Sequence, residues 1–177
     1  MALPGRDQTF AYENCREMLN KLKREIERYC AVAGVVELLE GETLLRHVDQ
    51  LKDSAFNASV TAWHLADWVF NDLTPEQRQT LNLESLDELQ CRARKQCRAL
   101  YLCRHVATAS KHWSVKKHPD PTIKAVVECS EAGWAGYFFD GSTKTPANQV
   151  LNAALEFWTQ FIYRNDIAKE DAIPDST

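Results

Sequence analysis

Basic and imidazole side chains are concentrated in one stretch of the chain, Cys91 to His118. This stretch contains no Asp or Glu, although Asp and Glu outnumber Lys and Arg by 25 to 21 in the whole chain. Its cations are Arg92, Arg94, Lys95, Arg98, Arg104, Lys111, Lys116 and Lys117. Three of the five histidines also fall here, at His105, His112 and His118. On an acidic chain, such a concentration is typical either of an anion-binding surface or of a solvated helix face.

Arg98 and His105 have the residue types and the spacing to act on a phosphate group. Seven residues make almost two helical turns, so on a helix both side chains lie on one face. There a guanidinium can offset charge on an RNA phosphate, while an imidazole transfers a proton during attack by the neighbouring 2′-hydroxyl. This chemistry needs no metal, and we expect no cofactor. The supporting candidates further along the same helix are Arg104, Thr108, Lys111 and His112.

A second set of polar side chains recurs at seven-residue steps within the segment 43–73. Together with one acidic neighbour, this set is named the polar line, and its members are Asn57, His64, Asn71 and Asp67. The polar line borders an aromatic line that is typical of a buried helix face, formed by Phe56, Trp63 and Phe70. If this helix packs beside the helix that carries His105, the two sets of polar groups meet along one rim.

The meeting of these groups has several interpretations. They can form a buried polar network that fixes helix register, or they can carry the RNA chemistry described above. They can also bind a metal through His64 and Asp67 together with His105 or His112. The last two histidines are about 10.5 Å apart along a helix, so hardly both can reach one ion. A non-catalytic alternative is a helical bundle that binds a protein partner or a small anionic ligand through the same rim.

The hydrophobic pattern predicts a mostly helical single domain over residues 1–177. Apolar residues recur at three- and four-residue steps in four segments, which we predict to be helices at 7–39, 43–73, 85–117 and 145–168. Asp7 is the expected N-cap of the first helix, and Ser85 with Glu88 forms a capping box for the third. The segment 122–140 is rich in β-branched and aromatic residues. The expected architecture is a four-to-five-helix up-down bundle with a small β-hairpin inserted before the last long helix.

A helical bundle with R-x4-6-H on its third or fourth helix resembles the HEPN superfamily. The resemblance covers residues 7–168, and it implies Arg98 as the phosphate binder and His105 as the proton-transfer group. Active HEPN members are metal-independent ribonucleases that usually pair the motif across a dimer cleft, and many are toxins or components of prokaryotic defence systems. The resemblance therefore implies RNA as substrate, a homodimer and a protein partner such as an antitoxin. The segments 62–70 and 109–113 also look like parts of small uncharacterised bacterial helical proteins.

Composition narrows the classes of protein further. An apolar share of 45% and an aromatic share of 10% are typical of a folded globular chain. No apolar run approaches the roughly 20 residues that span a bilayer, and the N-terminus lacks a signal-peptide pattern, so we expect a cytoplasmic protein with no membrane contact. A net charge of −4 argues against general, high-affinity binding of nucleic acid. The six cysteines have no C-x2-C spacing, which indicates reduced thiols.

Overall fold

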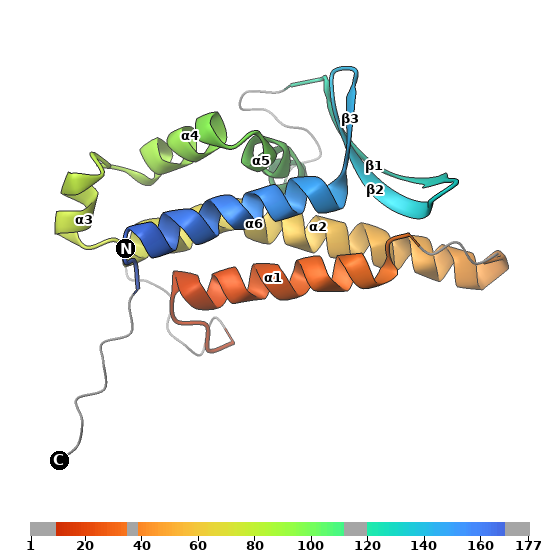
Figure 1. The fold of residues 1–177 in the computed structure, drawn as a ribbon, viewed down its shortest axis with the longest axis horizontal. Coiled ribbons are helices and arrows are strands. Elements are labelled where there is room, and N and C mark those ends of the chain that lie inside the picture. The colour runs from red at the N-terminus through yellow and green to blue at the C-terminus, as the bar shows by residue number, and fades with distance from the viewer. Residues whose placement is uncertain (1–9, 35–38, 112–119, 169–177) are drawn as a thin grey trace, which may run out of the picture.

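The computed structural model describes residues 10–34, 39–111 and 120–168. This part of the chain is mostly helical, with a small antiparallel sheet before the last helix, as the sequence predicts (Figure 1). The helices are α1 (Cys15–Val32), α2 (Gly41–Asp72), α3 (Pro75–Thr80), α4 (Leu86–Gln96), α5 (Arg98–Lys111) and α6 (Ala147–Arg164). Within the described ranges, no helix is both long enough and apolar enough to cross a bilayer.

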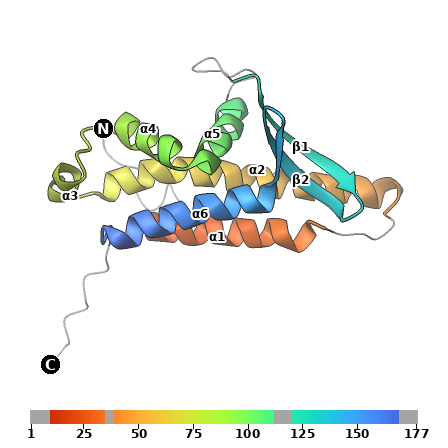
Figure 2. The same cartoon turned by 45° about the horizontal axis from the view of Figure 1, so that its top comes forward.

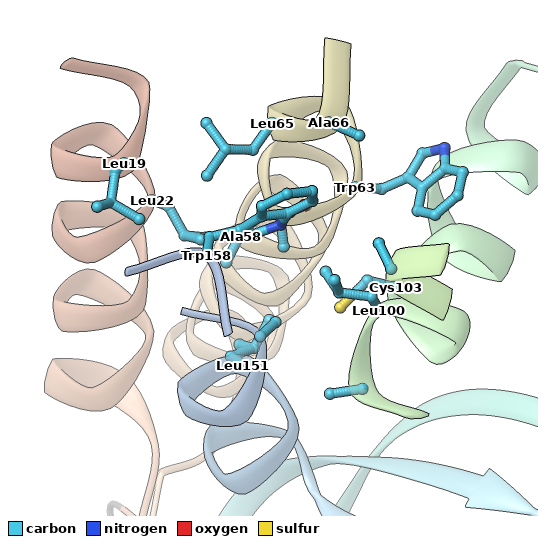
Figure 3. Packing of buried hydrophobic residues seen from close by; sticks show 14 of the residues in the cluster. Leu19, Leu22, Ala58, Trp63, Leu65, Ala66, Leu100, Cys103, Leu151 and Trp158 are labelled. Atoms are coloured by element: carbon cyan, nitrogen blue, oxygen red, sulfur yellow. The ribbon is translucent and has the colours of Figure 1, made fainter. Parts of the chain in front are cut away.

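The long helix α2 is the centre of the packing. It contacts α1, α4, α5, α6 and the sheet, and α1 and α6 lie along it side by side (Figures 1 and 2). Small and branched apolar residues recur around most of its circumference, which lets several neighbours approach closely. The fully buried Trp158 of α6 donates a hydrogen bond from Nε1 to the carbonyl oxygen of Ala62 on α2 at 2.8 Å. Its ring lies beside Leu22 and Ala58 (Figure 3).

The first helix is shorter than the predicted segment 7–39. It begins after Asn14, whose side chain accepts a hydrogen bond from the backbone N–H of Glu17 at 3.0 Å. It ends at Val32, and Gly34 follows with a φ of +78°. The predicted N-cap Asp7 lies outside the described residues. By contrast, the predicted second helix agrees with α2 to within two residues at each end.

The predicted third helix, 85–117, is two helices that meet at Cys97. Ser85 caps the first of them as expected, because its side chain accepts a hydrogen bond from the N–H of Glu88. Cys97 then adopts an extended backbone with φ −130° and ψ 104°, ends α4, and lets α5 start in a new direction (Figure 2). The apolar spacing of Leu89, Ala93 and Leu100 continues across the break, so the sequence pattern did not reveal it. Residues 112–117 of the predicted helix lie outside the described part.

The predicted hairpin is part of a three-stranded sheet. Its strands are β1 (Ile123–Ser130), β2 (Gly133–Asp140) and β3 (Thr143–Pro146), in the order β1-β2-β3 with antiparallel pairing. The third strand was not predicted, because four residues ending in a proline carry little β signal. Since β3 takes up the residues before Ala147, the last helix starts two residues later than predicted and ends at Arg164.

A close contact between Tyr29 and Gly136 joins the first helix to the sheet. The Gly136 N–H donates a hydrogen bond to the Tyr29 hydroxyl oxygen at 2.9 Å. A Cβ added at Gly136 would lie 3.2 Å both from this oxygen and from the Cβ of Ala147. A larger residue here would push against both neighbours, so glycine suits the close approach of α1, β2 and α6 at this point.

We expect Tyr29→Phe to lower the free energy of unfolding by about 1–3 kcal/mol. The substitution keeps the ring but removes the acceptor of the buried Gly136 N–H, which then loses its partner in the folded state. Urea denaturation measures the change. The matched control is Tyr163→Phe, because Tyr163 is 53% exposed and its substitution should change stability by less than about 0.5 kcal/mol. Equal stability of the two variants would contradict the prediction.

Candidate functional site

The first turns of α5 place Arg98, Tyr101 and His105 in one continuous stack. The Cζ atom of Arg98 lies 4.1 Å from the centroid of the Tyr101 ring. The ring centroids of Tyr101 and His105 are 4.9 Å apart, with the planes tilted by 59°. Residues three and four positions apart are neighbours on a helix surface, so this contact follows from the spacing. Tyr101 was not among the predicted site residues, although its position between Arg98 and His105 is readable from the sequence.

An acidic residue from the sheet holds the Arg98 guanidinium. Nε and Nη2 of Arg98 donate to Oδ2 and Oδ1 of Asp140, each at 2.6 Å. This two-point contact raises the pKa of Arg98 and lowers the pKa of Asp140, because each charge stabilises the other. The stretch around Arg98 is free of acids in the sequence, but the end of β2 supplies one in space. Any anion that binds to Nε and Nη2 of Arg98 must compete with this carboxylate.

A second carboxylate, that of Asp120, binds the middle of the stack. The Tyr101 hydroxyl donates to Oδ2 of Asp120 at 2.9 Å. Asp120 also accepts hydrogen bonds from Thr122, from the backbone N–H at 3.0 Å and from Oγ1 at 2.6 Å. The bonds from Thr122 and Tyr101 lower the pKa of Asp120, so it stays charged. Acids at one end of the sheet therefore fix both Arg98 and Tyr101 on α5.

His105 is nearly buried, with 7% of its surface exposed. Burial lowers its pKa, and the charge of Arg104 lowers it further. The imidazole is therefore neutral at neutral pH, which is the form that can accept a proton. Among the described residues, Nε2 of His105 has no hydrogen-bond partner. A proton acceptor of this kind fits general-base chemistry, provided that a substrate group reaches the ring.

The α4–α5 junction forms an open cavity of about 290 Å³ beside Arg98. Two lining residues, Arg94 and Lys95, come from the last turn of α4, and two, Arg98 and Tyr101, come from the first turn of α5. Basic residues in the last turn of a helix are favoured by its dipole, and here they also face a hollow. Three cations and one aromatic ring make this cavity suited to an anion that carries a flat group.

The polar line of α2 is only partly buried. Asn57 and Asn71 are exposed, whereas His64 and Asp67 are half-buried, and neither of these two is without a partner. In the described part of the chain, no hydrogen bond, ion pair or ring contact joins Arg98 or His105 to the polar line. The hydrogen-bond partner of Arg98 is Asp140 at the end of β2, and that of Tyr101 is Asp120, which precedes β1.

The remaining supporting candidates lie further along α5. Arg104 is 6% exposed, and burial followed by the charge of Arg94 lowers its pKa. Thr108 is half-buried one turn later. Lys111 is the last residue of α5, and His112 lies outside the described residues. Of the two cations in this set, Arg104 is thus the one whose side chain the structure places.

The described residues contain no cluster of three His, Cys, Asp or Glu side chains that can hold a metal ion. His64, Asp67 and His105 are all described, so this combination does not form the alternative metal site. The combination with His112 lies outside the described part.

All six cysteines are free thiols. Burial raises the pKa of the Cys15 thiol, which is typical of a core residue.

The burial of His105 predicts a loss of stability as the pH falls below neutral. Because the folded-state pKa is below the ordinary value of 6.5, the unfolded chain takes up the proton first and unfolding becomes easier as pH falls through that value. Glutamine does not titrate in this pH range. We therefore expect the free energy of unfolding of His105→Gln to fall less between about pH 7.5 and 5.5 than that of the wild type. Urea titrations at each pH measure the difference. Equal pH dependence in both proteins would contradict it.

Comparisons with known proteins identify no relative of this chain. No family model, no curated protein and no solved structure matches the chain. The resemblance to the HEPN superfamily therefore rests on the R-x6-H spacing of Arg98 and His105 and on the helical character of the fold.

Proposed function

We propose that this chain is a HEPN-like, metal-independent ribonuclease that binds RNA at the α4–α5 cavity. The observation that carries the proposal is the Arg98–Tyr101–His105 stack, of which Arg98 and Tyr101 line that cavity. The Arg98 guanidinium can donate two hydrogen bonds to a phosphate, and the cations Arg94 and Lys95 line the same cavity. Tyr101 offers an aromatic surface of the kind on which RNA bases stack. His105 supplies a neutral imidazole two helical turns from the phosphate binder.

In the proposed reaction, the 2′-hydroxyl of the bound RNA attacks the adjacent phosphorus. The His105 imidazole takes the hydroxyl proton, and the Arg98 guanidinium stabilises the additional negative charge on the phosphorane oxygens. The bond to the 5′-oxygen then breaks, this oxygen takes a proton from water, and His105 returns its proton to the solvent. The products are a 2′,3′-cyclic phosphate and a 5′-hydroxyl, so no oxidant, metal or cofactor takes part.

The proposal extends to the assembly and setting of the protein. We propose a cytoplasmic homodimer that brings two copies of the Arg98–Tyr101–His105 stack to one cleft, with α1, α2, α4, α5 and α6 forming a variant of the HEPN bundle. A second copy of the cations would double the phosphate contacts of a single RNA strand. A role as a toxin or defence protein, held inactive by a protein partner, is part of the same proposal.

The alternative is a non-catalytic protein that binds a small anionic ligand or a protein partner at the same cavity. The burial of His105 favours it, since only 7% of this residue is exposed. The contact of Arg98 with Asp140 favours it as well, because a carboxylate already occupies the two donors that would stabilise the phosphorane. The two candidates differ in one observable, which is the cleavage of bound RNA.

We expect the purified protein to cleave a fluorescent single-stranded RNA in the presence of EDTA. Arg98→Ala and His105→Gln should each lower the initial rate by about 100-fold or more, because each removes a group that acts in the transition state. The matched control is Arg28→Ala, since Arg28 is an exposed cation on α1, and it should cleave at the wild-type rate. Thermal denaturation checks that all three variants are folded. RNA binding without cleavage would favour the non-catalytic alternative, and full activity of Arg98→Ala would refute the assigned site.

We expect Asp140→Asn to bind RNA several-fold more tightly than the wild type. The substitution removes the carboxylate that competes with phosphate for the Arg98 fork, while an amide keeps the side-chain size. Fluorescence anisotropy with a 2′-O-methylated RNA, which has no attacking hydroxyl, measures binding alone. Glu128→Gln, which neutralises another acid of the sheet, serves as the control and should bind like the wild type. Weaker binding by Asp140→Asn would show that Asp140 orients Arg98 and does not compete with the ligand.

A further inference from the structure

A second, apolar cavity of about 330 Å³ lies between α2, α5 and the sheet. Its size is within the range of small-molecule sites in proteins. Helix α2 contributes Lys52, Ala55, Phe56 and Ser59 to its lining. The proposed RNA chemistry uses none of these side chains.

The pairing register explains why this cavity is hollow. Ala125 pairs with Phe138, and Val127 pairs with Gly136, so these four residues share one face of the sheet. Of these four, Ala125 has no side chain beyond Cβ, and Ala55 of α2, which also lines the cavity, is equally small. A close-packed interior would place larger side chains at such positions. The small residues therefore leave a space that the protein itself does not fill.

The lining specifies the chemistry of a ligand. Most of it is apolar, and three of its members, Phe56, Tyr137 and Phe138, are aromatic. Phe56 is 43% exposed, so part of its ring is accessible from outside the cavity. The Ser59 hydroxyl donates to the carbonyl oxygen of Ala55 at 2.7 Å, so this donor is already used. An apolar, flat molecule can replace water on these surfaces without leaving a buried polar group unpaired.

Among the described residues that line this cavity, Lys52 is the one that carries a charge. Its ammonium contacts Asp49 at 3.2 Å, and both side chains are mostly exposed, at 58% and 69%. An exposed pair of this kind is worth little, so the ammonium is available to an incoming anion. A cation at the edge of an apolar hollow matches a ligand with a single negative group at one end.

We propose that this cavity binds a small aromatic carboxylate, with the ring between α2 and the sheet and the carboxylate at Lys52. The inference is independent of the proposed ribonuclease activity, because Arg98, Tyr101 and His105 do not line this cavity. Its test also has a separate readout, which is the binding of a small molecule.

The test uses two probes of the same shape, 2-naphthoate and its uncharged analogue 2-naphthalenemethanol. Isothermal titration calorimetry should show 2-naphthoate binding at one site per chain, with a Kd of about 0.1–1 mM for a ligand of this size. The alcohol should bind about tenfold more weakly, because it lacks the charge that meets Lys52. Equal affinities for the two probes, or no saturable binding of either, would overturn the proposal.

Substitutions then locate the site. Ala125→Phe should abolish the binding of both probes by filling the cavity, and Ala125 is exposed on a strand that accepts aromatic residues. If that variant fails to fold, Val106→Phe fills the same cavity from α5. Lys52→Ala should weaken 2-naphthoate to the affinity of the alcohol, whereas the control Lys23→Ala, an exposed lysine on α1, should bind like the wild type. Unchanged binding in both filled variants would place the site elsewhere and refute the inference.

Discussion

The structure depends on the burial of α2 from several directions at once. A helix that is contacted by α1, α4, α5, α6 and the sheet must carry apolar or small residues around most of its circumference. Its middle does so, because Ala58, Ala62 and Ala66 alternate with larger buried residues such as Leu65. The alanines let neighbouring helices come close, and the larger side chains fill the spaces that remain. Every other element is placed by its contact with this helix or with an immediate neighbour of it.

The candidate site results from a change of chain direction beside that central helix. The sequence pattern predicts a single straight helix over 85–117. The extended residue Cys97 instead turns α5 away from α4, and the angle between the two helices creates the basic cavity. The sheet then supplies Asp120 and Asp140, which fix the direction of the side chains on α5. The site is thus a product of α4, α5 and the sheet, and charges of both signs meet in it.

The sequence predicts the local features of this structure better than the relations between distant segments. Helical periodicity located α2 closely, and the Ser85 cap located the start of α4, since both signals depend on neighbouring residues. The break at Cys97 has no such signal, because the apolar spacing is the same on both sides of it. Tertiary packing determines that the helix breaks at Cys97, and local helix propensity does not reveal such an effect.

The same distinction applies to the candidate site. The spacing of Arg98 and His105 is a local property, and their position on one face of α5 follows from it. Asp140 is 42 residues away from Arg98 along the chain, and the pairing of the two residues depends on how the sheet docks against α5. The burial of His105 is likewise a tertiary effect. Residue types and spacing therefore suggested the cations, but they could not reveal the acids that hold them.

The hydrogen bond between Trp158 and Ala62 has a consequence for the order in which the chain can fold. The two residues are 96 positions apart, and the contact of Tyr29 with Gly136 spans 107 positions. During synthesis, the apolar surface of α2 emerges well before α6 and the sheet exist to cover it. The nascent chain must keep that surface from aggregating until its last third leaves the ribosome, and a product truncated before Ala147 lacks α6 altogether.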